Sequence, residues 1–241
     1  MEPQERQQQQ GMSEEDLTRM NRVLRHRLRN LASGIKSTVA YLSQELAGRL
    51  APQELEYFPL VLNECDALSD LTSRMSLLFD ELPPGSDMMA GDWLQELSVR
   101  FHDRFPTSLL AVEAAAEFQA VALSSPAWLS AAAMELLTNA AEAAPAKLVR
   151  LKGLVDGGDA VLRLQDSGPG IREEELAQCF KPFYTTKVRH LGIGLGIAGR
   201  WAGRLKGQLK AERQTAGGLI FDLRWPIDRS EINHRLTPAA T

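Results

Sequence analysis

Several residue classes that mark particular kinds of protein are scarce in this chain of 241 residues. Its 2 cysteines, Cys65 and Cys179, lie far apart and form no CxxC pair, which disfavours a disulfide scaffold and a zinc site. Gly and Pro, with 18 and 12 residues, are close to average usage, which excludes collagen-like and wholly disordered chains. We therefore expect an ordinary folded protein with two free thiols.

Long hydrophobic runs are also missing. No stretch approaches the ~18 uninterrupted apolar residues that a membrane helix needs. The Gln-rich residues 1–12 have no apolar segment of the kind found in a signal peptide. A net charge of −4 argues weakly against a nucleic-acid partner. These features predict a soluble, cytoplasmic protein with no membrane insertion, and 44% apolar residues suffice for one large or two small domains.

The first third of the chain has the periodicity of two long helices. Ser13, with Asp16 three residues on, is typical of an N-cap. Apolar residues then recur at steps of three or four, which predicts a long amphipathic helix with a coiled-coil-like seam: Leu17, Met20, Leu24, Leu28, Leu31, Ile35, Val39, Leu42 and Leu46. The pattern breaks around residues 48–52. A second series runs from Leu55 to Leu82, in which Pro59 either kinks the helix or marks its start.

Two helices joined by a short turn form an antiparallel hairpin, and one hairpin cannot bury both of its apolar stripes. Two copies can do so as a four-helix bundle, so we expect residues 13–82 to form a homodimer. The alternative is a hairpin that packs on the C-terminal domain of its own chain. Residues 1–12 are expected to be a flexible lead, and the Pro- and Gly-containing residues 83–90 a linker.

The remaining residues, 91–228, mix helices with antiparallel hairpins, and residues 229–241 are expected to be a loose tail. The patterns predict helices over 93–105, 126–144 and 195–205, and strands over 109–112, 119–123, 147–155, 160–165, 208–213 and 219–225. Turn signals at residues 156–159 and 216–218 join the last four strands into two hairpins. This order predicts an α+β sandwich with one sheet and helices on one of its faces.

Two motifs in this region carry side chains suited to ligand binding. Glu135 and Asn139 are four residues apart on the Ala-rich helix and therefore share a face. A carboxylate and an amide so placed suit Mg²⁺, which takes oxygen ligands and keeps several waters. Asp166, followed by Gly168 and Gly170, comes directly after an apolar strand. Such a carboxylate can accept a hydrogen bond from an exocyclic amine, and the glycines allow close approach of the backbone.

Two further motifs follow at residues 180–187 and 192–196. The second contains Gly192, Gly194 and Gly196 and opens a helix, whose free N–H groups can hold phosphate oxygens. Each motif alone also fits a solvated helix stripe or an ordinary turn, and the glycine run lacks the spacing of a P-loop. The order and spacing of all four motifs are far more specific than any one of them.

With these motifs, residues 130–225 resemble the ATP-binding domain of sensor histidine kinases, a branch of the GHKL (Bergerat-fold) ATPases. The motifs at residues 135–139, 166–170, 180–187 and 192–196 resemble its N, G1, F and G2 boxes. The resemblance implies that Asn139 holds Mg²⁺, that Glu135 is a catalytic or Mg²⁺-supporting acid, and that Asp166 binds the adenine amine of ATP. It implies that nucleotide and cation are bound by Asn139, Asp166, Gly168, Gly170, Thr186, Lys187, Gly192, Gly194, Leu195 and Gly196.

The resemblance also gives the helical hairpin a role, because the phosphoacceptor histidine of this family lies on the first helix of a dimeric bundle. His26 is the only histidine on that helix, and its position beside Leu24 and Leu28 predicts that it points outward. A neutral imidazole nitrogen is a competent nucleophile. Asn30, one turn later, corresponds to a family position that orients water for dephosphorylation of the partner. Arg27 departs from the family pattern, in which the residue after the histidine is usually acidic.

These features predict a homodimeric two-component histidine kinase. It would autophosphorylate His26 from Mg-ATP and pass the phosphoryl group to an aspartate of a response-regulator receiver domain, with input from a separate sensor or regulatory protein. Arg27, with Arg25 and Arg29, makes the His26 region basic and suited to an acidic partner surface. Two alternatives stay open: a histidine phosphotransferase or scaffold with a vestigial nucleotide site, and a response-regulator phosphatase that uses Asn30.

Overall fold

The computed structural model describes residues 14–187, 191–215 and 217–227. The expected N-cap Ser13, the lead, the tail and Ala216 lie outside these ranges. The chain divides into two compact units, and the boundary falls between Asp80 and Glu81. Within the described ranges, no helix is long and apolar enough to cross a membrane.

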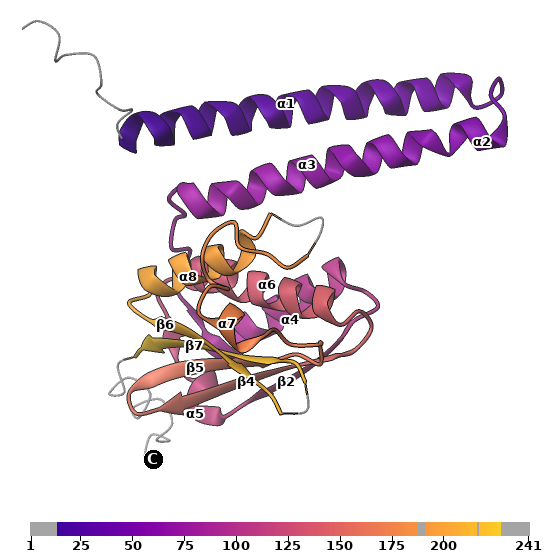
Figure 1. Ribbon diagram of the computed structural model, residues 1–241. Helices are drawn as coiled ribbons and strands as arrows, with labels where there is room; N and C mark the ends of the chain where they lie inside the picture. Colours follow the sequence, from indigo (N-terminus) through magenta and orange to yellow (C-terminus); the bar gives the residue numbers. More distant parts are fainter. Residues whose placement is uncertain (1–13, 188–190, 216, 228–241) are drawn as a thin grey trace, which may run out of the picture. The chain divides into compact units, whose positions relative to one another are not determined.

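The first unit is a helical hairpin (Figure 1). It consists of α1 (Glu14–Leu46), the short α2 (Pro52–Leu55) and α3 (Tyr57–Phe79). Pro59 lies in the first turn of α3, where a backbone N–H has no partner within the helix, so it marks a start and introduces no kink. The last helical residue, Phe79, precedes the predicted end of this helix by three residues, because the backbone of Asp80 is extended.

Small and polar residues line the contact between α1 and α3. The buried residues are Arg25 and Ala32 on α1 and Cys65 and Thr72 on α3. The predicted apolar seam lies elsewhere on the helix surface: Leu24 is 50% exposed, Leu31 61% and Ile35 48%. The hairpin described by itself therefore leaves its apolar stripe uncovered, as the periodicity argument predicts for one copy.

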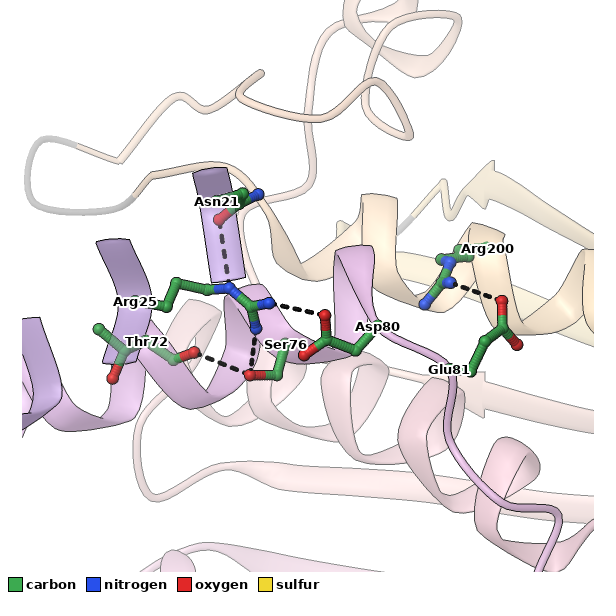
Figure 2. Close-up of polar contacts among 7 residues, drawn as sticks. All are labelled: Asn21, Arg25, Thr72, Ser76, Asp80, Glu81 and Arg200. Atoms are coloured by element: carbon green, nitrogen blue, oxygen red, sulfur yellow. Dashed lines mark hydrogen bonds and ion pairs between the residues drawn. The ribbon is translucent and has the colours of Figure 1, made fainter. Parts of the chain in front are cut away.

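Arg25 is the most unusual residue of this contact, because its side chain is charged and only 3% of the residue is exposed. Figure 2 shows its guanidinium between the two helices. Nη2 donates to Asp80 Oδ1 at 2.6 Å, Nε donates to Asn21 Oδ1 at 3.2 Å, and Nη1 donates to Ser76 Oγ. These bonds satisfy the buried charge and tie the α1 turn beside His26 to the last turn of α3.

We expect Arg25→Ala to destabilise the hairpin by about 2 kcal/mol, because it removes three hydrogen bonds, one of them to a carboxylate. All four tryptophans (93, 128, 201 and 225) lie in the second unit. Urea unfolding followed by far-UV circular dichroism should therefore shift, while the tryptophan fluorescence transition should not. Arg29→Ala, at an exposed position of the same helix, is the matched control. Equal unfolding curves for the two variants would contradict the structural role of Arg25.

The second unit is built on a mixed sheet of five strands (Figure 1). The strands are β2 (Leu109–Ala114), β4 (Leu148–Asp156), β5 (Asp159–Gln165), β6 (Gln208–Arg213) and β7 (Leu219–Pro226). Their order is β2-β4-β5-β7-β6; β2 and β4 run parallel, and the other neighbours are antiparallel. Both predicted hairpins, β4–β5 and β6–β7, are confirmed.

Helices cover one face of this sheet (Figure 1). They are α4 (Ala90–Arg104), α6 (Pro126–Ala143) and α8 (Gly194–Arg204), with a short α7 (Glu173–Leu176). The largest fully buried side chains come from these helices, from one face of the sheet and from a short turn: Trp93, Leu97, Phe101, Phe118, Leu129, Leu136, Leu137, Leu151, Leu162, Leu164, Trp201 and Phe221. The predicted α+β class is confirmed.

Two segments differ from the prediction. Only Ala122–Leu123 (β3) of the expected strand 119–123 is extended, and Ala116–Gln119 forms a helical turn, α5. This turn buries Phe118, whose ring fills the space above Gly153: a Cβ there would lie 2.5 Å from the ring. In the expected linker, Met88–Met89 (β1) pairs with β3, and α4 already begins at Ala90. The backbone hydrogen bonds between β1 and β3 explain why residues 88–89 form a strand and not a free linker.

The second unit begins with residues that are anchored to its helices. Glu81 pairs with Arg200 of α8 at 3.5 Å and also with Arg204 (the Arg200 pair is drawn in Figure 2). The indole Nε1 of Trp128, on α6, donates to the carbonyl oxygen of Leu82 at 2.6 Å. Residues 81 and 82 thus belong to the second unit.

Both cysteines are free and buried, one in each unit. Burial raises the pKa of the Cys179 thiol to about 11. This thiol is therefore protonated at neutral pH and offers no thiolate nucleophile.

Candidate functional site

The candidate phosphoacceptor, His26, lies on the exposed surface of α1, as its position beside the seam predicted. The side-chain nitrogen of Asn30 lies 3.3 Å from His26 Nδ1. In this orientation the amide donates to Nδ1, and the ring proton is on Nε2. Rotation of the amide by half a turn would place its oxygen beside Nδ1–H and leave Nε2 with a free lone pair. Asn30 can therefore select the tautomer in which Nε2 is the nucleophile.

The basic character of this surface comes from fewer arginines than the sequence suggested. Arg27 and Arg29 are exposed on α1. The Arg25 side chain instead points into the hairpin and is paired with Asp80. Its charge is therefore paired inside the hairpin, and of the three arginines named with His26 only Arg27 and Arg29 add positive charge to the surface.

The Ala-rich helix α6 carries three side chains with a carboxylate or an amide, namely Glu135, Asn139 and Glu142. Glu135 is buried, with 6% of its surface exposed, whereas Asn139 and Glu142 are partly exposed. Lys187 lies across the latter two: its Nζ donates to Asn139 Oδ1 at 3.1 Å and to Glu142 Oε2 at 3.0 Å. Asn139 and Lys187 were predicted as ligands from two motifs that lie far apart in the sequence. The structure brings these two residues into direct contact.

Asp166 follows the last residue of β5 and is almost fully buried, with 3% of its surface exposed. Its Oδ1 accepts a hydrogen bond from the backbone N–H of Gly168 at 2.8 Å. Its Oδ2 is buried and has no hydrogen-bond partner among the described residues. Burial raises the pKa of this carboxyl group, while hydrogen bonds from Gly168 and Leu219 and the charge of Lys187 act to lower it. A buried acceptor of this kind suits a ligand N–H.

Neighbouring atoms lie so close to two glycines around Asp166 that a side chain would not fit there. A Cβ on Gly168 would lie 2.9 Å from Asp166 Oδ1, and one on Gly218 would lie 2.3 Å from the Asp166 carbonyl oxygen. Gly170 has a φ of +74°, in the left-handed region that favours glycine. The backbone beside Asp166 therefore carries no side chain at these glycines.

The other two motifs meet at Gly192. Its φ is +65°, and a Cβ there would lie 2.2 Å from the Tyr184 carbonyl oxygen. Its own carbonyl oxygen accepts a hydrogen bond from Phe183 N at 2.8 Å. Gly194 is the first residue of α8, next to Leu195 and Gly196, so the helix N-terminus and its N–H groups begin here. Thr186 is exposed in the segment that precedes this helix.

Two residues of this region were not among the predicted site residues. Glu142 lies one turn beyond Asn139, and its shared face with Glu135 and Asn139 could have identified it. Gln214 Nε2 donates to the carbonyl oxygens of Asp166, at 2.9 Å, and Leu219, at 3.2 Å. Gln214 thus holds the end of β5 against the turn after β6, a role that no local pattern indicates.

Comparisons with known proteins identify this domain. Residues 124–229 match the model of the histidine kinase-, DNA gyrase B- and HSP90-like ATPase family. The chain carries a sensor histidine kinase catalytic core. A curated relative, sporulation kinase C of Bacillus subtilis, is 33% identical over 95 residues, which are 39% of this chain and 22% of that protein.

Another relative of this kinase core matches across both units. The sensory histidine kinase/phosphatase NtrB of Azospirillum brasilense is 25% identical over 251 aligned positions, which cover 92% of this chain and 59% of that protein. The full-length crystal structure of ShkA in complex with AMPPNP is similar in fold, with a TM-score of 0.67 at 18% identity over 87% of this chain and 46% of that one. The chain spans only part of the length of these proteins.

Proposed function

We propose that this chain is a two-component histidine kinase that transfers the γ-phosphoryl group of Mg-ATP to His26 and then to an aspartate of a response-regulator receiver domain. One observation carries the proposal. An exposed imidazole, with an amide 3.3 Å from Nδ1, is part of the same chain as a GHKL-type ATPase domain. We further propose that two copies form the kinase, with their hairpins in one four-helix bundle.

In the proposed site, the carboxylate of Asp166 accepts a hydrogen bond from the adenine amine. Gly192, Gly194 and Gly196, with Leu195 between them, give phosphate oxygens access to the backbone N–H groups of the α8 N-terminus. Thr186 and Lys187 lie on the preceding segment and can reach the phosphates. Gly168 and Gly170 leave room for the base.

The residues of α6 fit a divalent cation. Asn139 Oδ1 and Glu142 Oε2 already hold a positive charge, the ammonium group of Lys187, and such hard oxygen atoms are the donors that Mg²⁺ prefers. We propose Asn139 as a ligand, with Glu135 in support. No group of three His, Cys, Asp or Glu side chains in the described part of the chain could hold a metal on its own. When bound, Mg²⁺ would neutralise phosphate charge and complete its coordination with phosphate and water oxygens.

The phosphoryl transfer requires of the protein mainly that it positions the nucleophile and the γ-phosphate. His26 Nε2 attacks the γ-phosphorus in line, the bond to the β,γ-bridging oxygen breaks, and ADP leaves with the electron pair. Asn30, through its oxygen, holds the proton on Nδ1 during the attack, and the cationic phosphoimidazole that forms then loses this proton to water. Arg27 and Arg29 give the surroundings a positive charge that suits the incoming phosphate.

Incubation with γ-³²P-ATP and Mg²⁺ tests this proposal. We expect His26→Gln to reduce incorporation by at least about 100-fold, because it removes the only nucleophile of the transfer. His102→Gln is the matched control, since His102 is exposed on α4, away from the motifs. The label on the parent protein should be stable to alkali and labile to acid, as expected for phosphohistidine. Undiminished label on the His26 variant would refute the assignment.

The contact between Asn30 and His26 also favours a second activity, dephosphorylation of the response regulator. Asn30 is exposed on the same surface and can orient a water molecule. If this is the main activity, Asn30→Ala will abolish dephosphorylation of a phosphorylated receiver domain, and the parent protein will incorporate little label at His26. A scaffold with a vestigial site would instead fail to bind ATP.

A further inference from the structure

Lys187 is held by two residues from successive turns of α6. Its ammonium nitrogen lies 3.1 Å from the amide oxygen of Asn139 and 3.0 Å from a carboxylate oxygen of Glu142. The Lys187 side chain is 30% exposed and that of Glu142 29%, so the contact is partly shielded from water. An ion pair at this depth is stronger than one on an open surface.

The two oxygen atoms cannot serve Lys187 and a divalent cation at the same time. An ammonium group is a compact point charge with three donors, and it fills the space beside the oxygens that it contacts. A metal ion bound to Asn139 would lie within a few ångströms of this charge, where like charges repel strongly in a partly buried setting.

We propose that Lys187 is the resident counter-ion of Asn139 and Glu142, and that it competes directly with the divalent cation for these oxygens. Cation binding then requires the ammonium group to leave α6, and Glu142 has two opposing effects. It retains Lys187 in the nucleotide-free protein, and it offers a carboxylate oxygen to the incoming cation. The inference rests on the proposed Mg²⁺ site but not on phosphorylation of His26.

The test uses Mn²⁺ alone as the probe and the full chain without nucleotide. Bound Mn²⁺ is counted by the loss of the electron paramagnetic resonance signal of the free ion. Lys187→Met removes the ammonium group and keeps both oxygens, so we expect Mn²⁺ affinity to rise at least about 10-fold. Lys187→Arg keeps the charge and should stay within about twofold of the parent protein. Lys181→Met, an exposed lysine of the same segment, is the matched control and should not change.

A second pair of variants shows whether the gain arises at α6. Lys187→Met with Glu142→Gln should lose most of the gain, because the carboxylate that the lysine released is no longer present. Thermal unfolding followed by tryptophan fluorescence verifies that each variant is folded. Unchanged or weaker Mn²⁺ binding by Lys187→Met would overturn the proposal, and so would a gain that persists in the double variant. Failure of the kinase assignment would appear separately, as missing label at His26.

Discussion

Replacing Asp166 by asparagine should greatly weaken nucleotide binding while leaving the nucleotide-free protein at least as stable as before. The carboxylate has one oxygen bonded to Gly168 N and one buried oxygen with no partner among the described residues. The amide of asparagine would place a donor or a mismatched acceptor there, so a ligand amine would be buried without its bond. We expect ADP affinity to fall at least about 100-fold, which is roughly 3 kcal/mol.

The expected stability follows from the pKa of Asp166. Burial raises the pKa of this carboxyl group, so ionisation is less favourable in the folded chain than in the unfolded one. Its charge therefore opposes folding at neutral pH, and this cost disappears as the pH falls below the folded pKa. The neutral amide avoids the cost at every pH. The Asp166→Asn protein should unfold at the same or a higher temperature at neutral pH.

The same reasoning gives a pH dependence of binding. In the parent protein, Asp166 becomes protonated as the pH falls through its raised pKa, and ADP affinity should decline over that acidic range. Isothermal titration calorimetry with ADP across this range, and differential scanning fluorimetry without ADP, measure the two effects. Affinity like that of the parent protein in Asp166→Asn would exclude this carboxylate as the base-binding group.

Asp222 provides the matched control. It is also buried, but it accepts two hydrogen bonds from Arg163, at 2.7 and 2.6 Å, and lies on β7, away from the glycine motifs. Asp222→Asn removes a charge from a paired group and should lower stability while it keeps ADP affinity. The two substitutions should thus have opposite effects on stability and on binding, which separates a ligand-binding carboxylate from a structural one.

Much of the fold was predictable because it depends on local patterns. Periodicity identified the helices, and turn residues such as those at 156–159 identified the hairpins. The helical turn α5 was missed, because it places Phe118 above Gly153, a contact between residues 35 positions apart in the sequence. Local propensity carries no information about such a partner.

In the candidate site, too, local patterns were predictable and contacts between distant residues were not. The four motifs place Asn139, Asp166 and Gly192 correctly on a helix, after a strand and before a helix. The contact of Lys187 with Glu142 joins residues 45 positions apart in the chain, and the Arg25 contact with Asp80 joins residues 55 apart. Side chains of opposite charge are common at the surface, so composition cannot show which of them pair. Only packing decides these contacts.

The apolar face of α1 leads to the last prediction, a large loss of dimerisation on Ile35→Asp. Leu31 and Ile35 are 61% and 48% exposed in the single hairpin, while α1 and α3 meet through small and polar residues. A second hairpin would cover this face. In a dimer with twofold symmetry, the substitution is present in both copies and affects the interface twice. Loss of two buried isoleucines is worth about 4 kcal/mol, or roughly a thousandfold in the dimer dissociation constant, and the buried charges add to it.

Sedimentation equilibrium over a wide range of protein concentration measures this change. Ser37→Asp is the matched control, because Ser37 is exposed on α1 about half a turn away from Ile35, so its charge stays in water. We expect the control to remain dimeric and the Ile35 variant to be monomeric with unchanged ADP affinity, since the second unit is untouched. A parent protein that is monomeric at every concentration would instead favour a hairpin covered by its own chain. Both variants add the same charge to the same helix. A difference in their dimerisation therefore shows which face of α1 is buried in the dimer.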